Sequence, residues 1–263
     1  MPFLIFRNSR YHYLDTLAKT PENKPALLLL PGNSTSSAVY QDEIDYFGKN
    51  FRVLCPDYCG YGKSHRLQEL PVDFWMHNAS VCGALADSLN LKSLIVIGTS
   101  GGGLIGLCLS IIRPDLVKAL VADSIPGDMI PPEVAQSVVN GRQPRTRFQK
   151  RLWSRAHGDD WEDVVDADSR LLLRASLLKC GPYHGRIPEI VCPVLFTGSL
   201  NDDLIPQIGP RICEVASRIR KSRVALYPSG WHPFMWSMAA TFRKEADRFI
   251  SDCLANQTES RPT

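Results

Sequence analysis

Runs of consecutive apolar residues alternate along the chain with longer segments in which apolar residues recur every three or four positions. The short runs predict strands buried on both faces of a sheet, at residues 26–30, 51–55, 94–97, 119–122, 191–197 and 224–227. The periodic segments predict helices at residues 38–47, 74–89, 104–112, 207–219 and 235–254. Because the strands alternate with helices, we expect an α/β fold with a mostly parallel sheet covered on both faces.

The two ends of the chain depart from this alternation. Residues 3–6 and 11–17 predict two short strands of an antiparallel hairpin at one edge of the sheet, followed by a turn at residues 20–25. Residues 256–263 predict a disordered tail. Function in a parallel sheet lies at the carboxyl ends of its strands, so the loops after the buried strands are where we expect the chemistry.

The strand pattern also breaks in the middle of the chain. Between residues 124 and 188 there is no clear buried strand, and the segment, which has four prolines in its first part, predicts several helices. We therefore predict a core domain formed by residues 1–123 and 189–263, with residues 124–188 inserted as a helical lid. A chain of 263 residues is long enough for one large domain with such an insertion.

A glycine-flanked serine follows the strand predicted at residues 94–97. Residues 98–102 read Gly-Thr-Ser-Gly-Gly, which fits G-x-S-x-G, and a predicted helix comes next. This strand–turn–helix setting is the one that the nucleophile-elbow motif requires. Such a turn is sharp and strained, and glycine on either side removes side chains that would collide there. The N-terminus of the helix, with its free N–H groups, favours negative charge that develops beside Ser100 during attack.

A serine hydroxyl becomes an effective nucleophile when a base accepts its proton, and histidine is the usual base. The chain has six histidines, of which His232 alone directly follows a late strand, in Ser-Gly-Trp-His-Pro at 229–233. This position would place His232 at the carboxyl edge of the sheet. We therefore predict that His232 is the base and that the other five histidines are solvated or structural.

A carboxylate should orient that histidine. Two loops at the expected edge offer one: the loop after the strand at 191–197 contains Asp202 and Asp203, and the preceding strand runs into Asp123. Asp202 would complete a chain order of Ser, Asp and His, which is the order of the α/β-hydrolase triad. The pattern alone leaves the three acids as alternatives.

Five short motifs together resemble those of serine-dependent α/β-hydrolases, an esterase- and lipase-like family with a helical lid. In chain order they are PGNS at 31–34, DYCGYGKS at 57–64, GTSGG at 98–102, DDLIP at 202–206 and GWH at 230–232. They span nearly the whole chain apart from the predicted lid. The resemblance implies the α/β-hydrolase fold and a catalytic triad of Ser100, Asp202 and His232. In this family the acid commonly lies four residues before a proline, as Asp202 lies before Pro206.

The resemblance also implies an oxyanion hole made by two backbone N–H groups, those of Asn33 and Gly101. Two positions depart from the family pattern: Pro31 replaces the usual histidine of the first loop, and Thr99 replaces the histidine that commonly precedes the nucleophile. Relatives that open epoxides or remove halides use aspartate as the nucleophile, so Ser100 argues against both activities.

Composition adds few constraints. The weak formal net charge of +3 points to no nucleic-acid partner, and 44% hydrophobic residues are ordinary for a soluble enzyme. No apolar run is long enough to span a membrane, and residues 1–6 are too short for a signal-peptide core. Eight cysteines without an export signal are typical of reduced thiols, so we expect a cytoplasmic protein. Neither the GKS at 62–64 nor the pair Cys55 and Cys59 completes a nucleotide or metal motif, and we expect no cofactor.

Charged residues are unevenly distributed in the predicted lid. Residues 142–155 contain six Lys or Arg, and residues 159–168 contain six Asp or Glu. These can be solvated faces of neighbouring helices that pair with each other. Alternatively, the basic segment can form an entrance that attracts an anionic substrate such as a carboxylate or a coenzyme A ester.

Taken together, these features predict a cofactor-free serine hydrolase. We expect it to cleave a carboxylic ester or thioester of a small, partly apolar molecule through an acyl-enzyme. The same triad serves carbon–carbon bond hydrolases, acyltransferases and cofactor-free haloperoxidases in the family, and these alternatives stay open. A further alternative is a ligand-binding protein on this fold without catalysis. The sequence leaves the substrate, its acyl length and the oligomeric state open.

Overall fold

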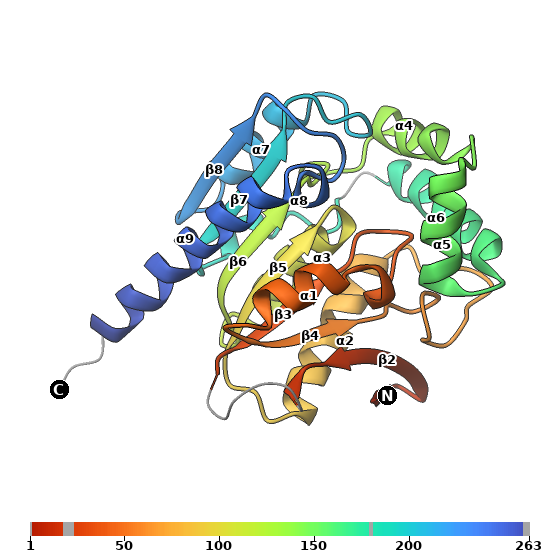
Figure 1. Cartoon of the computed structure of the whole chain (residues 1–263). Coiled ribbons are helices and arrows are strands. Elements are labelled where there is room, and N and C mark those ends of the chain that lie inside the picture. The colour runs from red at the N-terminus through yellow and green to blue at the C-terminus, as the bar shows by residue number, and fades with distance from the viewer. Residues whose placement is uncertain (1, 18–23, 179–180, 260–263) are drawn as a thin grey trace.

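The computed structural model describes residues 2–17, 24–178 and 181–259. Among them, eight strands form one sheet with the order β1-β2-β4-β3-β5-β6-β7-β8. The strands are β1 (Phe3–Phe6), β2 (Ser9–Asp15), β3 (Ala26–Leu30), β4 (Arg52–Pro56), β5 (Leu94–Thr99), β6 (Val117–Asp123), β7 (Val194–Ser199) and β8 (Ser222–Tyr227). The pairs β1–β2 and β2–β4 are antiparallel, and the other neighbouring pairs are parallel. The predicted, mostly parallel sheet with an antiparallel hairpin at one edge is confirmed (Figure 1).

Helices cover both faces of this sheet, as predicted (Figure 1). Side chains of β3 alternate between two hydrophobic clusters, with Leu27 and Leu29 in one and Leu28 and Leu30 in the other. The helices of the first cluster are α1 (Gln41–Phe47), α8 (Phe234–Ser237) and α9 (Ala239–Glu259). The second cluster includes side chains of α2 (Phe74–Ser88), α3 (Gly101–Ile112) and α7 (Ile208–Ser217). Both faces of the sheet are buried at β3, which is why all five residues of that strand are apolar.

The chain between β6 and β7 forms a group of helices that stands beside the sheet (Figure 1). They are α4 (Pro132–Arg142), α5 (Arg147–His157) and α6 (Trp161–Ser176), and the short η3 (Ile187–Glu189) follows them in the chain. A capping box between Thr146 and Gln149 marks the start of α5. Val134 of α4 and Leu171 of α6 belong to the same hydrophobic cluster as α2 and α3, so these helices pack onto the sheet layer. Helices are present where they were expected in residues 124–188, and the division into core and lid stays a prediction.

The structure corrects the last predicted helix. Residues 235–254 do not form one helix, because the backbone of Met238 (φ −129°, ψ 44°) leaves the helical region between α8 and α9. Helix α9 then continues to Glu259, so the disordered tail predicted from residue 256 is wrong up to that point. Extending an existing helix adds one hydrogen bond for each residue, so the helix can outlast its apolar pattern. Residues 260–263 lie outside the described residues.

Two further details concern element boundaries. Strand β7 begins at Val194 rather than at residue 191, because Pro193 has no N–H to offer the sheet. Most of the turn predicted at residues 20–25 lies outside the described residues. None of the described helices combines the length and apolar character needed to cross a membrane.

Candidate active site

The candidate nucleophile lies at the junction of β5 and α3. Because β5 ends at Thr99 and α3 begins at Gly101, Ser100 alone makes the turn. Its backbone has φ 53° and ψ −121°, a strained conformation for a residue with a side chain. A Cβ atom at Gly98 would lie 2.3 Å from the carbonyl oxygen of Gly102, so the turn has no room for a side chain there. The turn is as sharp as the G-x-S-x-G pattern predicts, and it presents Ser100 at the carboxyl end of β5.

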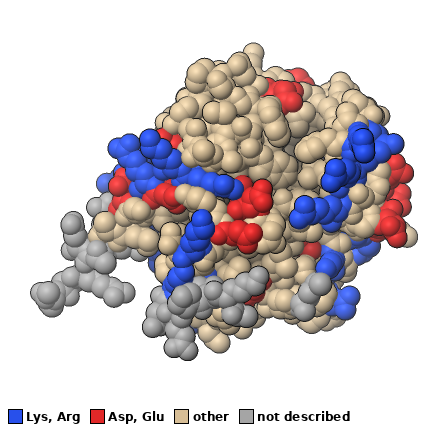
Figure 2. All heavy atoms as spheres, viewed as in Figure 1, with Lys and Arg blue, Asp and Glu red and all other residues tan. Residues whose placement is uncertain are grey.

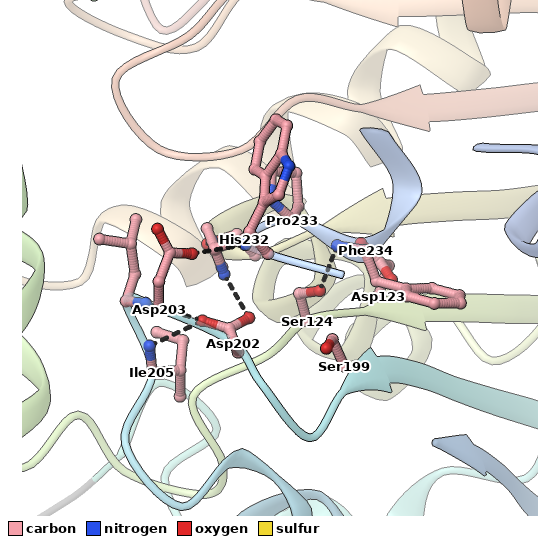
Figure 3. A network of polar contacts seen from close by, with 12 residues as sticks. Asp123, Ser124, Ser199, Asp202, Asp203, Ile205, His232, Pro233 and Phe234 are labelled. Carbon is pink, nitrogen blue, oxygen red and sulfur yellow. Dashed lines mark hydrogen bonds and ion pairs between the residues drawn. The ribbon is translucent and has the colours of Figure 1, made fainter. Parts of the chain in front are cut away.

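His232 lies against Ser100. It follows β8 in a loop, and its Nε2 is 3.0 Å from the Oγ of Ser100. Its Nδ1 is 2.8 Å from Oδ2 of Asp202, which lies in the loop after β7 (Figure 3). The structure therefore brings together Ser100, His232 and Asp202, three residues that are far apart in the sequence.

The two adjacent acids of the loop after β7 make different contacts. Oδ1 of Asp202 accepts hydrogen bonds from the backbone N–H groups of Leu204 and Ile205, at 3.0 and 2.8 Å. Asp203 instead accepts a hydrogen bond from the backbone N–H of His232, at 2.7 Å (Figure 3). Asp202 therefore contacts the ring and Asp203 the main chain of the same histidine. The sequence could not separate these contacts, because both acids lie in one turn.

The proton affinity of His232 reflects these neighbours. Burial by itself would lower the pKa of the ring, whose exposed fraction is 9%. The charge and hydrogen bond of Asp202, together with the charges of Asp123 and Asp203, outweigh burial and raise the pKa of His232 above its ordinary value. A raised pKa strengthens the ring as a proton acceptor and stabilises the imidazolium that forms when a serine gives up its proton.

Asp123, the third acid considered from the sequence, is fully buried at the end of β6. It accepts hydrogen bonds from the hydroxyls of Thr99 and Thr197, at 2.8 and 2.7 Å, and from the backbone N–H of Met235, at 3.1 Å. Burial raises the pKa of Asp123 to about 6, although these hydrogen bonds act in the opposite direction. Thr99, which departs from the family pattern, thus satisfies a buried carboxylate.

Ser124 extends this support for the loop of His232. Its Oγ accepts a hydrogen bond from the backbone N–H of Phe234, at 2.9 Å (Figure 3). Asp123 and Ser124 therefore hold the two N–H groups that begin α8, only two and three residues beyond His232. Sequence reasoning missed this positioning role, because it appears only when the ends of β6 and β8 come together.

The loop that contains Asn33 lies beside Ser100. A Cβ atom at Gly32 would be 3.5 Å from the Cβ of Ser100, and one at Gly101 would be 3.2 Å from the backbone nitrogen of Asn33. Gly101 is the first residue of α3, so its N–H has no carbonyl partner within the helix. The structure thus brings Asn33 and Gly101, whose N–H groups are the expected oxyanion donors, together beside the candidate nucleophile.

A cavity of about 600 Å³ adjoins Ser100 and His232. Its walls come from loops at the carboxyl ends of the strands and from helices α4 and α5. Most of the lining side chains are apolar, and four of them are tryptophans: Trp75, Trp153, Trp231 and Trp236. A cavity of this size and lining suits a small molecule with a sizeable apolar part.

The basic residues of the helical segment fall into two groups. Arg142 is buried and forms an ion pair with Asp168 of α6, and Arg145 pairs with Asp166. The exposed basic residues of α5 are Arg147, Lys150, Arg151 and Arg155. Figure 2 shows Lys and Arg gathered on the side where Figure 1 places α5, with acidic side chains beside them. Three of these exposed residues line a separate surface groove rather than the cavity at Ser100.

Comparisons with known proteins extend this picture. Haloalkane dehalogenase 2 of Mycobacterium tuberculosis (strain ATCC 25618 / H37Rv) is 34% identical over 112 residues, which are 43% of this chain and 37% of the dehalogenase. The match thus spans little more than a third of that relative's length. "Putative carbamate hydrolase RutD" of Pseudomonas savastanoi pv. phaseolicola (strain 1448A / Race 6) is 33% identical over 228 residues, which are 79% of this chain and 86% of the relative.

Among solved structures, MGS-M2, an alpha/beta hydrolase enzyme from a Medee basin deep-sea metagenome library, has a TM-score of 0.77 with this chain. The two structures match over 95% of this chain and 97% of the other, at 15% sequence identity, so this likeness concerns the fold. The family model for the alpha/beta hydrolase fold matches residues 25–152. With this match, the long alignment to RutD and the shared fold, the chain belongs to the alpha/beta hydrolase fold family.

Proposed function

We propose that the chain is a serine hydrolase that cleaves a carboxylic ester or thioester of a small, partly apolar molecule. The observation that carries this proposal is the continuous line of contacts from Ser100 through His232 to Asp202, at 3.0 and 2.8 Å. A hydroxyl within hydrogen-bond reach of a base, with the base oriented by a carboxylate, is the arrangement that activates a serine.

In the proposed mechanism, Ser100 attacks the carbonyl carbon while Nε2 of His232 accepts the hydroxyl proton. Asp202 holds the ring in the matching tautomer and stabilises the imidazolium. The backbone N–H groups of Asn33 and Gly101 bind the oxyanion, and each such donor is worth about 2.7–4 kcal/mol. His232 then protonates the leaving alcohol or thiol. The same ring then deprotonates water, which attacks the acyl carbon, and the ring returns the proton to the Oγ of Ser100 as the acid is released.

We also propose that residues 124–188 act as a lid over this site. Helices α4 and α5 supply apolar side chains to the cavity, among them Val134, Phe148 and Trp153. A lid of this kind excludes water from the acyl-enzyme and provides apolar surface for the substrate. The cavity volume of about 600 Å³ favours a substrate larger than a simple acetate ester.

Hydrolysis of a carbamate is a second candidate, because the relative named as a carbamate hydrolase aligns over 79% of this chain. The same nucleophile and oxyanion donors can act on a carbamate carbonyl. The apolar lining of the cavity favours an ester with a larger apolar group over a small, polar carbamate. Halide removal is less well supported, because Ser100 occupies the position where such relatives have aspartate.

Labelling with a fluorophosphonate probe tests the activated serine. We expect one adduct, located on Ser100 by peptide mass spectrometry, and no labelling in Ser100→Ala or His232→Ala. Ser110→Ala is the matched control, because Ser110 is a buried serine of α3 that does not line the cavity. Folded wild-type protein that stays unlabelled, or that is labelled on another residue, would contradict the proposal.

A substrate panel then distinguishes the bonds cleaved. It contains p-nitrophenyl esters of increasing acyl length, acyl thioesters and phenyl carbamates, with products identified by mass spectrometry. We expect turnover of esters or thioesters, with loss of turnover in Ser100→Ala by a factor of about 10⁴ or more. Turnover of carbamates alone would favour the second candidate. Tight retention of a ligand without any cleaved product would favour a binding protein.

A further inference from the structure

A buried carboxylate joins the helical segment to the loop of Asn33. Asp168 of α6 has no exposed surface, and its Oδ1 accepts a hydrogen bond from Nδ2 of Asn33 at 2.6 Å. The same oxygen accepts a hydrogen bond from the hydroxyl of Tyr61. Its Oδ2 lies 2.5 Å from the guanidinium of Arg142, at the end of α4. One carboxylate of the helical segment therefore contacts two loops of the sheet layer and a second helix of the segment.

The side-chain amide of Asn33 is held at both ends. Its Nδ2 donates to Asp168, and its Oδ1 accepts a hydrogen bond from the indole N–H of Trp75, at 3.2 Å. An amide with one fixed acceptor and one fixed donor can adopt one orientation only. The amide also lies directly over the start of α3, since a Cβ atom at Gly101 would be 1.6 Å from the Oδ1 of Asn33. The side chain is thus fixed between Asp168, Trp75 and Gly101.

We propose that Asp168 is a positioning residue for the oxyanion hole, acting through the side chain of Asn33. By fixing that side chain, it fixes the backbone N–H of Asn33 against Ser100. This inference rests on the proposed function, in which that N–H binds the oxyanion. It implies that the oxyanion hole is complete only when α6 is packed onto the loop of residues 31–34.

The charge of Asp168 fits this role. A carboxylate that is fully buried requires hydrogen bonds and a counter-charge, which the hydroxyl of Tyr61 and the guanidinium of Arg142 supply. Arg142 in turn donates a hydrogen bond to Ser169, at 3.0 Å. Hydrogen bonds to a charged acceptor are about twice as strong as those between neutral groups, so the bond to Asn33 is a firm one.

A purely structural role is the alternative, in which the cluster only packs α6 onto the sheet layer. The two roles predict different kinetics. Misalignment of the oxyanion-hole N–H groups lowers kcat and leaves KM almost unchanged. The reason is that the carbonyl oxygen of the bound substrate forms weaker hydrogen bonds with those N–H groups than the oxyanion of the transition state does. Loss of packing lowers the free energy of unfolding and the amount of folded enzyme, with the kcat of each folded molecule unchanged.

The first experiment compares Asp168→Ala, Asp168→Asn and Tyr61→Phe in the full chain with p-nitrophenyl butyrate. We expect Asp168→Ala to lower kcat by about 10- to 100-fold, less than the 10²–10³-fold cost of removing an oxyanion donor outright, with KM within about threefold. Asp168→Asn keeps an acceptor for Asn33 and should recover part of the loss. Tyr61→Phe removes the other hydrogen bond to the same oxygen, leaves Asn33 in place and should retain kcat within about threefold.

A tetrahedral inhibitor gives a second reading of the same variants. Phenylboronic acid forms an adduct on an activated serine, so its affinity should fall in Asp168→Ala by about the same factor as kcat. A kcat unchanged in folded Asp168→Ala, or lowered equally in Tyr61→Phe, would overturn the proposal. If Asp168→Ala does not fold, Asn33→Ala removes the side chain through which Asp168 acts and leaves the charges of Asp168 and Arg142 in place. An unchanged kcat in that variant would overturn the proposal as well.

Hydrogen exchange separates failure of this proposal from failure of the proposed function. We expect faster amide exchange in a peptide covering residues 31–37 of Asp168→Ala, with residues 98–104 unchanged, and no such effect in Tyr61→Phe. This response does not require turnover, so it can be seen even in a protein that cleaves no ester. Exchange at residues 31–37 that is the same in wild type and folded Asp168→Ala would contradict the positioning role, whatever the enzyme hydrolyses.

Discussion

Two buried carboxylates near the cavity, Asp202 and Asp168, are held in different ways. Asp202 is bound by two backbone N–H groups of its own loop and by the ring of His232. Asp168 is bound by side chains from three separate segments, namely Asn33, Tyr61 and Arg142. The side chains of both acids are fully buried, so each depends entirely on its protein partners. Local chain geometry thus fixes Asp202, whereas tertiary packing fixes Asp168.

This difference implies that Asp202 serves mainly the reaction of the proposed enzyme, whereas Asp168 also serves the packing of its fold. A change at Asp202 disturbs one ring and one turn, so it should alter the reaction while the fold persists. A change at Asp168 disturbs the packing of α6, the loop of Asn33 and a buried arginine together. Effects at Asp202 should therefore appear in rate, and effects at Asp168 in both rate and stability.

The largest expected effect is that of Asp202→Asn. The amide can offer an N–H to Nδ1 of His232, which stabilises the wrong tautomer for accepting a proton from Ser100. We expect kcat for ester hydrolysis to fall by about 10⁴-fold, as expected when the acid of a triad is replaced by its amide. The measurement is steady-state kinetics with p-nitrophenyl butyrate, alongside circular dichroism to confirm the fold.

Asp203→Asn is the matched control for that change. The neighbouring amide oxygen can still accept the hydrogen bond from the backbone N–H of His232. Its expected loss of kcat is less than about tenfold, because one neutral hydrogen bond replaces a charged one. Equal losses in Asp202→Asn and Asp203→Asn would show that the two acids do not have the separate roles assigned to them.

The next effect in size is that of Gly101→Ala. The new methyl group would lie 1.6 Å from the Oδ1 of Asn33, so the side chain of Asn33, which is hydrogen-bonded to Asp168, must move. We expect kcat to fall by about 10²–10³-fold, the cost of losing one oxyanion donor. Gly83→Ala in α2 is the control, because its nearest neighbour would be at an ordinary 3.5 Å. Normal kcat in Gly101→Ala would contradict the close packing of Asn33 on the elbow.

The sequence predicted the parts of the site that depend on strand ends. Ser100, His232 and Asp202 each follow a buried strand, and the carboxyl ends of parallel strands share one edge of the sheet. Their types and chain order therefore led to the expectation that they meet, and the structure places them in contact. The tandem acids stayed ambiguous, because a turn can direct either side chain toward the ring.

The contacts of Asp168 could not be predicted in the same way. Asp168 is one of six acids at residues 159–168, where the pattern predicts a solvated helix face, and nothing in its spacing marks it as buried. Its partners Asn33 and Arg142 lie 135 and 26 positions away, and helix packing alone decides that they meet. Helical periodicity identified the helices of this segment, but it does not specify how one helix packs onto the loops of another layer.

A third buried carboxylate, Asp123, lies at a strand end and accepts hydrogen bonds from two threonine hydroxyls and one backbone N–H. Its negative charge contributes to the raised pKa of His232. Asp123→Asn removes that charge, so the pKa of His232 should fall. The acid limb of the kcat/KM profile, which reports the base of the free enzyme, should then move to lower pH. The plateau rate should change by less than about tenfold, since the base itself remains.

Thr197→Val is the control for Asp123→Asn, because it removes a hydrogen bond to Asp123 without changing the charge of the protein. An acid limb that moves equally in both variants, or not at all, would contradict an electrostatic role.

The pH dependence of the free energy of unfolding is an independent test of the raised pKa of Asp123. The pKa of Asp123, raised to about 6, exceeds that of an unfolded aspartate near 3.9, so this group destabilises the fold increasingly as pH rises from about 4 to 6. Asp123→Asn should remove that part of the pH dependence of unfolding.

The smallest expected effect concerns the exposed basic residues of α5, which, unlike Arg142, are not buried in an ion pair with Asp168. Lys150 and Arg151 line a surface groove apart from the cavity. At 0.15 M salt, the interaction between exposed charges that are more than about 8 Å apart is largely screened. In Lys150→Ala/Arg151→Ala, kcat/KM for a succinate half-ester should change by less than about threefold at 0.15 M salt, as for a neutral butyrate ester. A loss above about tenfold for the anionic ester alone would show that this face attracts substrate. Lys150 and Arg151 would then contribute to substrate specificity. The view that only the buried, paired charges of this segment affect the site would be wrong.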